Sequence, residues 1–182
     1  MTPDQRPENL EGLTSDDIYD RWIRPIESRL AATAYRVLRS DSQAADALQN
    51  AMIRIWKNRR TLTTHANPTA WMLRIVLNAT YEQLRRRRDR TNDIESVAAL
   101  DTVDDALSYD ESRSRVLSEL ASLSPQQAEA VMLRLVEELS YQEVADALDC
   151  SLATARVHVN RGREKLRSRL SDLDPANQGA ER

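Results

Sequence analysis

The feature that most constrains this chain is residues 124–170, because this stretch contains three successive helix starts. The first is Ser124, which stands before a proline and three residues before Gln127, the pattern of an N-cap with a capping-box partner. The second is Ser140, which forms the same pattern with Glu143. One apolar stripe is predicted for the first helix, at Ala128, Val131, Met132, Leu135, Val136 and Leu139. A helix and a shorter second helix should therefore follow one another here.

The third start is Ser151, which opens a helix with two unlike faces. The face expected to be buried is apolar: Leu152, Ala155, Val159, Gly162, Leu166 and Leu170. The outer face is largely polar and basic: Ala153, Arg156, Val157, Asn160, Arg161 and Arg163. Small residues that would let two helices cross closely are Ala145, Ala147, Ala155 and Gly162. This is the helix-turn-helix pattern of DNA-binding proteins, although an ordinary bundle with a solvated basic face fits the same spacing.

The composition favours an all-α protein of two small helical domains. Of 182 residues, 41% are hydrophobic, only three are Gly, and no run alternates in the manner of a strand. Seven acids and no base lie in residues 91–111, the mark of a linker. The expected organisation is a disordered tail (1–13), a first domain (14–90), an acidic linker (91–111), a second domain (112–172) and a disordered tail (173–182).

Charge and cysteine content point to a cytoplasmic protein. The single Cys150 excludes an internal disulfide and fits a reducing compartment. The N-terminus lacks a signal-peptide core, and no apolar run is long enough to span a bilayer. The formal net charge is −3, so any binding to DNA must come from local segregation of charge rather than from an overall basic surface.

The first domain should begin with a helix at Thr14, with Asp16 and Asp17 in its first turn. Pro25 should kink or split this helix, and Ser40 should cap the next one. The buried stripe of the first helix is expected at Ile18, Trp22, Ile26, Leu30, Ala34 and Val37.

The helix after Ser40 is expected to present an exposed ridge. Inward positions in AADALQNAMIRIWKNRR are predicted at Ala45, Leu48, Met52, Ile55 and Trp56. The ridge consists of Asp46, Gln49, Asn50, Ile53 and Lys57. An isoleucine on it hints at a partner surface, although single exposed apolar residues are normal.

Residues 61–67 read as a polar loop, after which Asn67 and Pro68 start a long helix. The residues expected to be buried in that helix are Met72, Ile75, Val76, Ala79 and Leu84. A second face combines aromatic rings, an amide and arginines, as a nucleic-acid surface requires: Trp71, Arg74, Asn78, Tyr81 and Arg85. The alternative is that Trp71 belongs to the core and that the arginines after it form a solvated helix end.

Together these motifs resemble the extracytoplasmic-function (ECF) group of bacterial RNA polymerase sigma factors, over residues from about 16 to 170. DALQNAMIRIW is similar to a family helix at Asp46, Gln49 and Trp56. PTAWMLRIVLNATYEQLRRRR matches a second motif at Ala70, Trp71, Arg74, Ile75, Asn78 and the arginine run. LSPQQAEAVMLRLVEELSYQEVADALDCSLATARVHVNRGREKLRSRL resembles the family's C-terminal helix-turn-helix. Two such matches, in the right order across an acidic linker, are far more specific than either alone.

The resemblance implies a role for each surface. The ridge residues Asp46, Gln49, Asn50 and Ile53 would dock on the beta-prime clamp of core RNA polymerase, whose beta flap is a further partner. The separated strand of the minus-ten element would be held by Thr64, His65, Asn67, Trp71, Arg74, Asn78 and Arg85, with the loop taking an extruded base. The minus-thirty-five element would be read by Ala153, Thr154, Arg156, Val157, Asn160 and Arg161. The acidic linker would thread toward the active-site and RNA-exit channel, and an anti-sigma factor is an expected partner.

The chain departs from the family pattern at several positions. Asn50 stands where a carboxylate is usual, Glu138 and Asp149 where glycines are usual, and Arg156 to His158 where Lys-Ser-Arg is common. Asp149 can adopt the left-handed conformation at some cost. Cys150 stands where the family has an apolar residue, so we interpret it as a small buried hydrophobe.

Two other functions are compatible with parts of the sequence. An autonomous helix-turn-helix regulator would account for residues 124–170 but would leave the ridge and the Trp71 helix unexplained. An enzyme is the weakest alternative, because the only histidines are His65 and His158 and no phosphate loop, metal spacing or nucleophile and base set is present. No cofactor is expected.

Overall fold

A computed structural model describes residues 14–93 and 104–171, and within these ranges the chain is helical without strands. The first domain contains α1 (Ser15–Ile18), a π-helical turn (Tyr19–Ile23), a 3₁₀ turn (Arg24–Ile26), α2 (Glu27–Leu38), α3 (Asp41–Lys57), α4 (Thr61–Thr64) and α5 (Pro68–Asp93). The second contains α6 (Asp104–Ala121), α7 (Pro125–Leu135), α8 (Tyr141–Leu148) and α9 (Leu152–Arg169). The predicted all-α class is confirmed.

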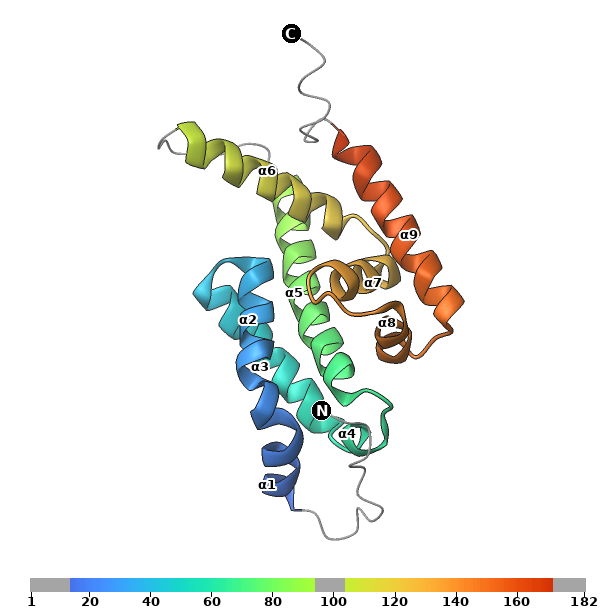
Figure 1. The fold of residues 1–182 in the computed structure, drawn as a ribbon. Coiled ribbons are helices and arrows are strands. Elements are labelled where there is room, and N and C mark those ends of the chain that lie inside the picture. Colours follow the sequence, from blue (N-terminus) through green and yellow to red (C-terminus); the bar gives the residue numbers. More distant parts are fainter. Residues whose placement is uncertain (1–13, 94–103, 172–182) are drawn as a thin grey trace.

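Helix α5 lies in the middle of the molecule. Figure 1 shows α2 and α3 on one side of it and α7 and α8 on the other, with α6 across its far end and α9 outermost. One continuous cluster of buried apolar side chains runs through both domains. The two domains are therefore packed against one another along α5.

Local signals near the N-terminus act as the sequence predicts. The Thr14 hydroxyl accepts from the backbone N–H of Asp17, whose carboxylate in turn accepts from the N–H of Thr14. Pro25 lies in a 3₁₀ turn that separates a π-helical turn from α2, so the expected split of the helix is confirmed. The reason is that proline lacks the N–H needed to continue the ladder.

The buried stripe of α3 agrees with the prediction only in part: Ile55 is buried and Leu48 and Met52 pack against the core, but other positions differ. The residues that face the core are Ala44, Ala47, Ala51 and Ile55. Ala45 is exposed instead, and Trp56 retains 36% of its surface, so the prediction that these two point inward is wrong. Small alanines let α3 approach its neighbours closely, which leaves the large indole outside, under the guanidinium of Arg59 at 5.3 Å.

Two further predictions fail for local reasons. Residues 61–64 form the single helical turn α4 rather than a loop, because Leu62 is buried and anchors it. Leu135 is 51% exposed although the periodicity puts it in the stripe, because α7 ends there. Ser124 begins α7 without a side-chain cap, and Gln127 accepts from the Lys165 ammonium instead of closing a capping box.

The helices also extend into the expected linker. Helix α5 continues to Asp93 and α6 begins at Asp104, so the composition of residues 91–111 hides helical ends. An acidic start is compatible with a helix, because negative charge is favoured at its N-terminus. The middle of the linker (94–103) and the tails expected at 1–13 and 173–182 lie outside the described residues.

Candidate nucleic-acid and partner interfaces

The ridge on α3 faces solvent as the spacing predicts. Asp46, Gln49 and Asn50 are exposed, and Ile53 is 47% exposed. Arg54, next to Ile53, forms two parallel hydrogen bonds to the carboxylate of Glu82 on α5, at 2.8 and 2.7 Å. This bidentate pair links α3 to α5 beside the ridge. Because Arg54 donates to it, the pKa of the Glu82 carboxyl lies below its usual value.

The segment between α4 and α5 has a shape set by its own side chains. The Asn67 side-chain oxygen accepts from the N–H of Ala70 at 3.0 Å and caps α5, as expected for an Asn before a proline. The Nδ1 atom of His65 accepts from the N–H of Asn67 at 3.0 Å. The rings of His65 and Trp71 lie 6.4 Å apart between centroids, and Thr64 is exposed. The turn is therefore preorganised, with an aromatic platform beside it.

The polar face of α5 is divided between solvent and the second domain. Arg74 donates from Nε to Glu129 on α7 at 2.8 Å and from Nη1 to the carbonyl of Ala147 on α8 at 3.1 Å. Tyr81 is buried, and its hydroxyl donates to the carbonyl of Leu123 at 2.8 Å. Asn78 is half-buried, whereas Arg85 is exposed. The middle of this face is thus covered, Arg85 at one end is open, and Trp71 at the other end is half-buried and packs against the core.

The outer face of α9 is open to solvent along its length. Its exposed residues are Ala153, Thr154, Arg156, Val157, Asn160 and Arg161. The helix starts with Ser151 accepting from the N–H of Thr154 at 3.1 Å, and the predicted capping box of Ser140 and Glu143 starts α8. The burial of Ala155, Val159 and Gly162 confirms the inner face, although Leu152 remains 36% exposed.

Close packing behind α9 involves α7 as well as α8. A Cβ on Gly162 would lie 2.5 Å from Cγ2 of Val131 and 3.3 Å from the carbonyl oxygen of Gln127, so any larger residue would force its neighbours to shift. The turns around α8 are made by non-glycine residues in the left-handed region, with φ of 56° at Glu138 and 53° at Asp149. Asp149 therefore adopts the conformation that the departure from the family's glycine predicts.

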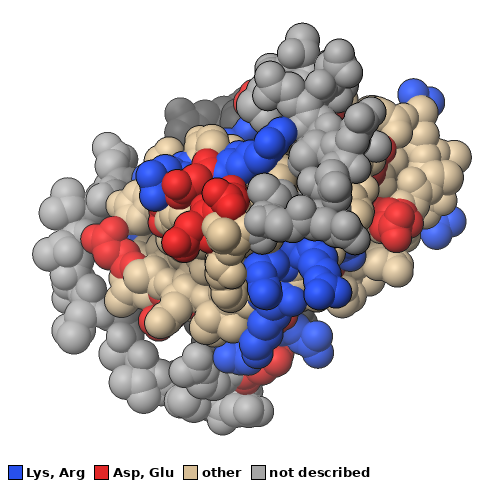
Figure 2. All heavy atoms as spheres, turned by 90° about the horizontal axis from the view of Figure 1, so that it is seen from below, with Lys and Arg blue, Asp and Glu red and all other residues tan. Residues whose placement is uncertain are grey.

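Charge is unevenly distributed over the surface. Figure 2 shows one cluster of Lys and Arg side chains on the face seen from below, while other Lys and Arg side chains of this face lie beside Asp and Glu. Such a local cluster allows a chain with a net charge of −3 to present a basic surface.

The matches to known proteins follow the same division of the chain. Residues 22–90 match the family described as Sigma-70 region 2, and residues 113–166 match Sigma-70, region 4. The chain belongs to the sigma-70 family, in its ECF group. Members of this family are initiation factors that act with core RNA polymerase and promoter DNA and carry no enzymatic activity of their own.

Several curated relatives align with most of this sigma factor. The RNA polymerase sigma-E factor of Streptomyces coelicolor is 28% identical over 158 residues, which cover 86% of this chain and 89% of the relative. The ECF RNA polymerase sigma factor SigW of Bacillus subtilis is 26% identical over 160 residues, with 81% and 86% covered. A solved structure of the sigma factor RpoE in complex with the anti-sigma factor NepR from Bartonella quintana is 26% identical and has a TM-score of 0.49, covering 81% of this chain and 92% of that one.

Cys150 of the sigma factor is a half-buried thiol at the start of the turn before α9. Partial burial raises the pKa of this thiol above its ordinary value, so the reactive thiolate is disfavoured. This agrees with its interpretation as a small apolar residue. Among the helices that the structure describes, none combines the length and apolar content needed to cross a bilayer.

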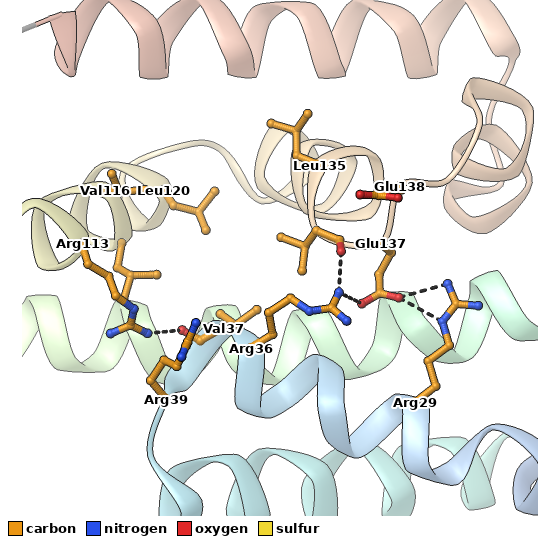
Figure 3. Close-up of a pocket in the computed structure, with 12 residues that line it drawn as sticks. Arg29, Arg36, Val37, Arg39, Arg113, Val116, Leu120, Leu135, Glu137 and Glu138 are labelled. Atoms are coloured by element: carbon orange, nitrogen blue, oxygen red, sulfur yellow. Dashed lines mark hydrogen bonds and ion pairs between the residues drawn. The ribbon is translucent and has the colours of Figure 1, made fainter. Parts of the chain in front are cut away.

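Sequence reasoning missed two groups of residues in this sigma factor. Tyr141 carries the guanidinium groups of Arg134 and Arg156 over its ring, at 5.4 and 5.6 Å from the centroid, and so helps to position Arg156. The second group joins Glu137 to Arg29, Thr33 and Arg36 across the domains. Figure 3 shows its two arginines beside Glu137. Partners more than 100 positions apart leave no periodic signal, so no local pattern could have identified them.

Proposed function

We propose that this sigma factor uses three separate surfaces to start transcription at selected promoters. The α3 ridge of Asp46, Gln49, Asn50 and Ile53 binds the beta-prime clamp, and the second domain reaches the beta flap. The turn at Thr64, His65 and Asn67, with the α5 face of Trp71, Arg74, Asn78 and Arg85, holds the separated strand of the minus-ten element. The outer face of α9 reads the minus-thirty-five element.

The observation that carries this proposal is the state of α9. Its N-terminus is capped, its inner face is buried down to Gly162, and its whole outer face is exposed with Arg156 and Arg161 on it. A helix held in this way can enter a major groove without disturbing the domain. The proposal extends to a place of action in the cytoplasm, where core polymerase works, and to control by an anti-sigma partner.

The test is reconstitution. Purified chain and core polymerase are combined on genomic DNA fragments, and transcript starts are mapped by run-off transcription. We expect starts that require both components. Each component alone is one control. As a second control, the transcripts that core polymerase starts by itself should be equally abundant with and without the chain. If the chain alters no start site while it binds promoter fragments tightly by itself, it acts as an autonomous helix-turn-helix regulator instead.

A further inference from the structure

The second domain occupies part of the face on which the separated strand is proposed to bind. Arg74 is tied at both ends of its guanidinium, to Glu129 and to the Ala147 carbonyl, and 31% of its side chain remains exposed. Two of the five N–H donors of this guanidinium are used, and Glu129 neutralises its charge, so its pairing with a phosphate is weakened. In this arrangement the second domain therefore competes with the strand for Arg74.

A buried carboxylate just after the C-terminal end of α7 forms a second contact between the two domains. The Glu137 side chain is 2% exposed, and all its partners lie on α2 of the first domain. Its Oε2 accepts from Nε of Arg29 at 3.1 Å, and its Oε1 accepts from the Thr33 hydroxyl at 2.6 Å and from Nη1 of Arg36 at 3.2 Å. Figure 3 shows Arg29 and Arg36 converging on this carboxylate from the α2 side.

The backbone after α7 aims Glu137 at α2. The N–H of Glu137 donates to the carbonyl of Met132, and the left-handed φ of Glu138 turns the chain immediately afterwards. Arg36 also donates to the carbonyl of Val136, so a single arginine holds both the helix end and the carboxylate. A buried carboxylate that lost these partners would be strongly destabilised until water reached it. The buried carboxylate therefore depends on the α2 partners for its stability.

Water is available next to this contact. A pocket of about 680 Å³ lies between α2, α6 and α7, and Arg29, Arg36 and Glu137 are among the residues that line it (Figure 3). The side chains of Arg29 and Arg36 are 44% and 50% exposed. Separation of the domains would hydrate all three charges, at the cost of exposing apolar side chains of the cluster that both domains share.

We propose that Glu137 is the latch of a closed form in which the second domain masks the strand-binding face of α5. Closure then competes with binding of the separated strand, because Arg74 belongs to both. The outer face of α9 stays exposed in the closed form, so masking is confined to the downstream contact. This inference rests on the proposed function only in naming that α5 face as the strand site; the latch itself rests on the interdomain contacts.

The experiment compares Glu137→Gln with Glu138→Gln, which make the same chemical change at neighbouring positions, one buried and one exposed. Both are placed in the full chain with Cys150→Ala and dyes on Ser42→Cys and Ser168→Cys, exposed sites on the two domains. We expect a fall in energy transfer for Glu137→Gln and none for Glu138→Gln. An unchanged transfer for both variants would overturn the latch.

Masking is tested by fluorescence anisotropy with a mixed-sequence single-stranded oligonucleotide of about 12 nucleotides, since stacking and phosphate contacts tolerate sequence. Glu137→Gln weakens the hydrogen bonds that hold the domains closed, so its affinity for the oligonucleotide should be about tenfold higher than that of the parent. Adding Arg74→Ala should remove this gain. Opening without a gain in affinity overturns masking. A chain that opens and gains affinity, yet fails in run-off transcription, supports the latch and counts against the proposed function.

Folding is checked by the cooperativity of urea unfolding. If Glu137→Gln does not fold, the double variant Arg29→Gln with Arg36→Gln replaces it, because both of those side chains are substantially exposed. It breaks the same contact from the opposite domain. The expected loss of energy transfer is the same, and its absence overturns the latch.

Discussion

The arginines of this sigma factor differ in whether other residues of the chain already use their hydrogen-bond donors. Arg74 and Arg36 are engaged by the second domain, whereas Arg156 rests on the Tyr141 ring and keeps its donors free for an outside partner. Arg161 forms no ion pair with any described residue and is exposed. A guanidinium whose donors are free can pair bidentately with a guanine edge or contact a phosphate.

The first prediction concerns these two free arginines. We expect at least one of Arg156→Ala and Arg161→Ala to relax base preference at one upstream position, at a cost of ~1–3 kcal/mol. Run-off transcription from the natural promoter and from one altered at that position measures the effect. Arg167→Ala, at the far end of α9, is the control and should leave base preference unchanged. Natural-promoter transcription at wild-type levels in both variants, with unaltered preference, would show that α9 does not read the sequence.

The second prediction concerns pH and the Arg54–Glu82 pair. The pKa of Glu82 is lowered in the folded state, so its contribution to stability is present above the unfolded pKa and is lost as pH falls through the folded pKa. Both side chains are 43% exposed, and screening limits the contribution to below about 1 kcal/mol. Glu82→Gln should thus lower the free energy of unfolding at pH 7, and the difference should shrink below the ordinary carboxyl pKa of 4.5.

Urea unfolding at pH 7 and at a pH below 4.5 checks this prediction, with Glu164→Gln on α9 as the control. Glu164 is exposed and has no ion pair with a described residue, so its substitution should have little effect at either pH. A Glu82→Gln difference that grows as the pH falls would contradict the assignment.

At the scale of helices, packing detail decides which surfaces are presented. Helix α3 buries a row of alanines, so its ridge is displayed by a helix that lies close to the core. Helix α9 buries Gly162 against Val131, so its outer face stands at a fixed distance from α7. Both helices bury small residues at their closest approaches, and their outer residues carry the proposed contacts.

The third prediction is that Asp46→Arg with Gln49→Ala weakens binding to core polymerase while the fold persists. Both side chains face solvent in the free protein, so their replacement should change the free energy of unfolding by less than about 0.5 kcal/mol. Co-purification with core polymerase measures binding, and Glu164→Arg, on the exposed side of α9, is the control for charge. Equal recovery of polymerase by the double variant and the parent would exclude this ridge as the docking site.

The fourth prediction is that Gly162→Ala destabilises the second domain. The new methyl group would meet Cγ2 of Val131 at 2.5 Å, an overpacking that costs ~1–3 kcal/mol, while helix propensity returns ~0.5–1 kcal/mol. Urea unfolding should show a net loss. Adding Val131→Ala removes the collision, so the double variant should be less destabilised than the sum of the single variants. Strict additivity would show that the two groups do not collide.

Some features of these helices are predictable from the sequence and others are not. Caps at Ser140, Ser151 and Asn67 were predictable because their partners lie three residues away. The register of α3 and the end of α7 were not, because period alone does not tell which of several adjacent apolar residues meets the core. The exposure of the outer face of α9 followed from spacing, whereas the covering of Arg74 depends on a partner 55 residues distant.

At the scale of the whole molecule, the closed arrangement of the domains and the net negative charge both weaken binding of the free chain to DNA. The chain carries a net charge of −3, and its second domain neutralises Arg74 with Glu129. If only a minor fraction of molecules is open, the apparent affinity for a ligand that binds the open form falls in proportion to that fraction. The free chain therefore has two reasons to bind promoter DNA weakly.

The fifth prediction is that the isolated chain shows little binding to a promoter duplex at physiological salt. Electrostatic attraction to phosphate supplies most non-sequence-specific affinity, and here it is confined to local patches. A gel-shift assay with and without core polymerase measures it, and a specific complex should form only with polymerase present. Tight and specific binding by the chain alone would favour the autonomous regulator.

The latch has a consequence for how this protein can change over evolutionary time. Glu137 lies in one matched region while Arg29 and Arg36 lie in the other, so replacement of the carboxylate alone would leave two arginines without their shared partner. We expect these three positions to drift together across related lineages. Arg74 is constrained from two sides and should change more slowly than they do. A lineage that has abandoned closure would then be recognisable by the joint loss of Glu137 and its arginines beside a retained Arg74.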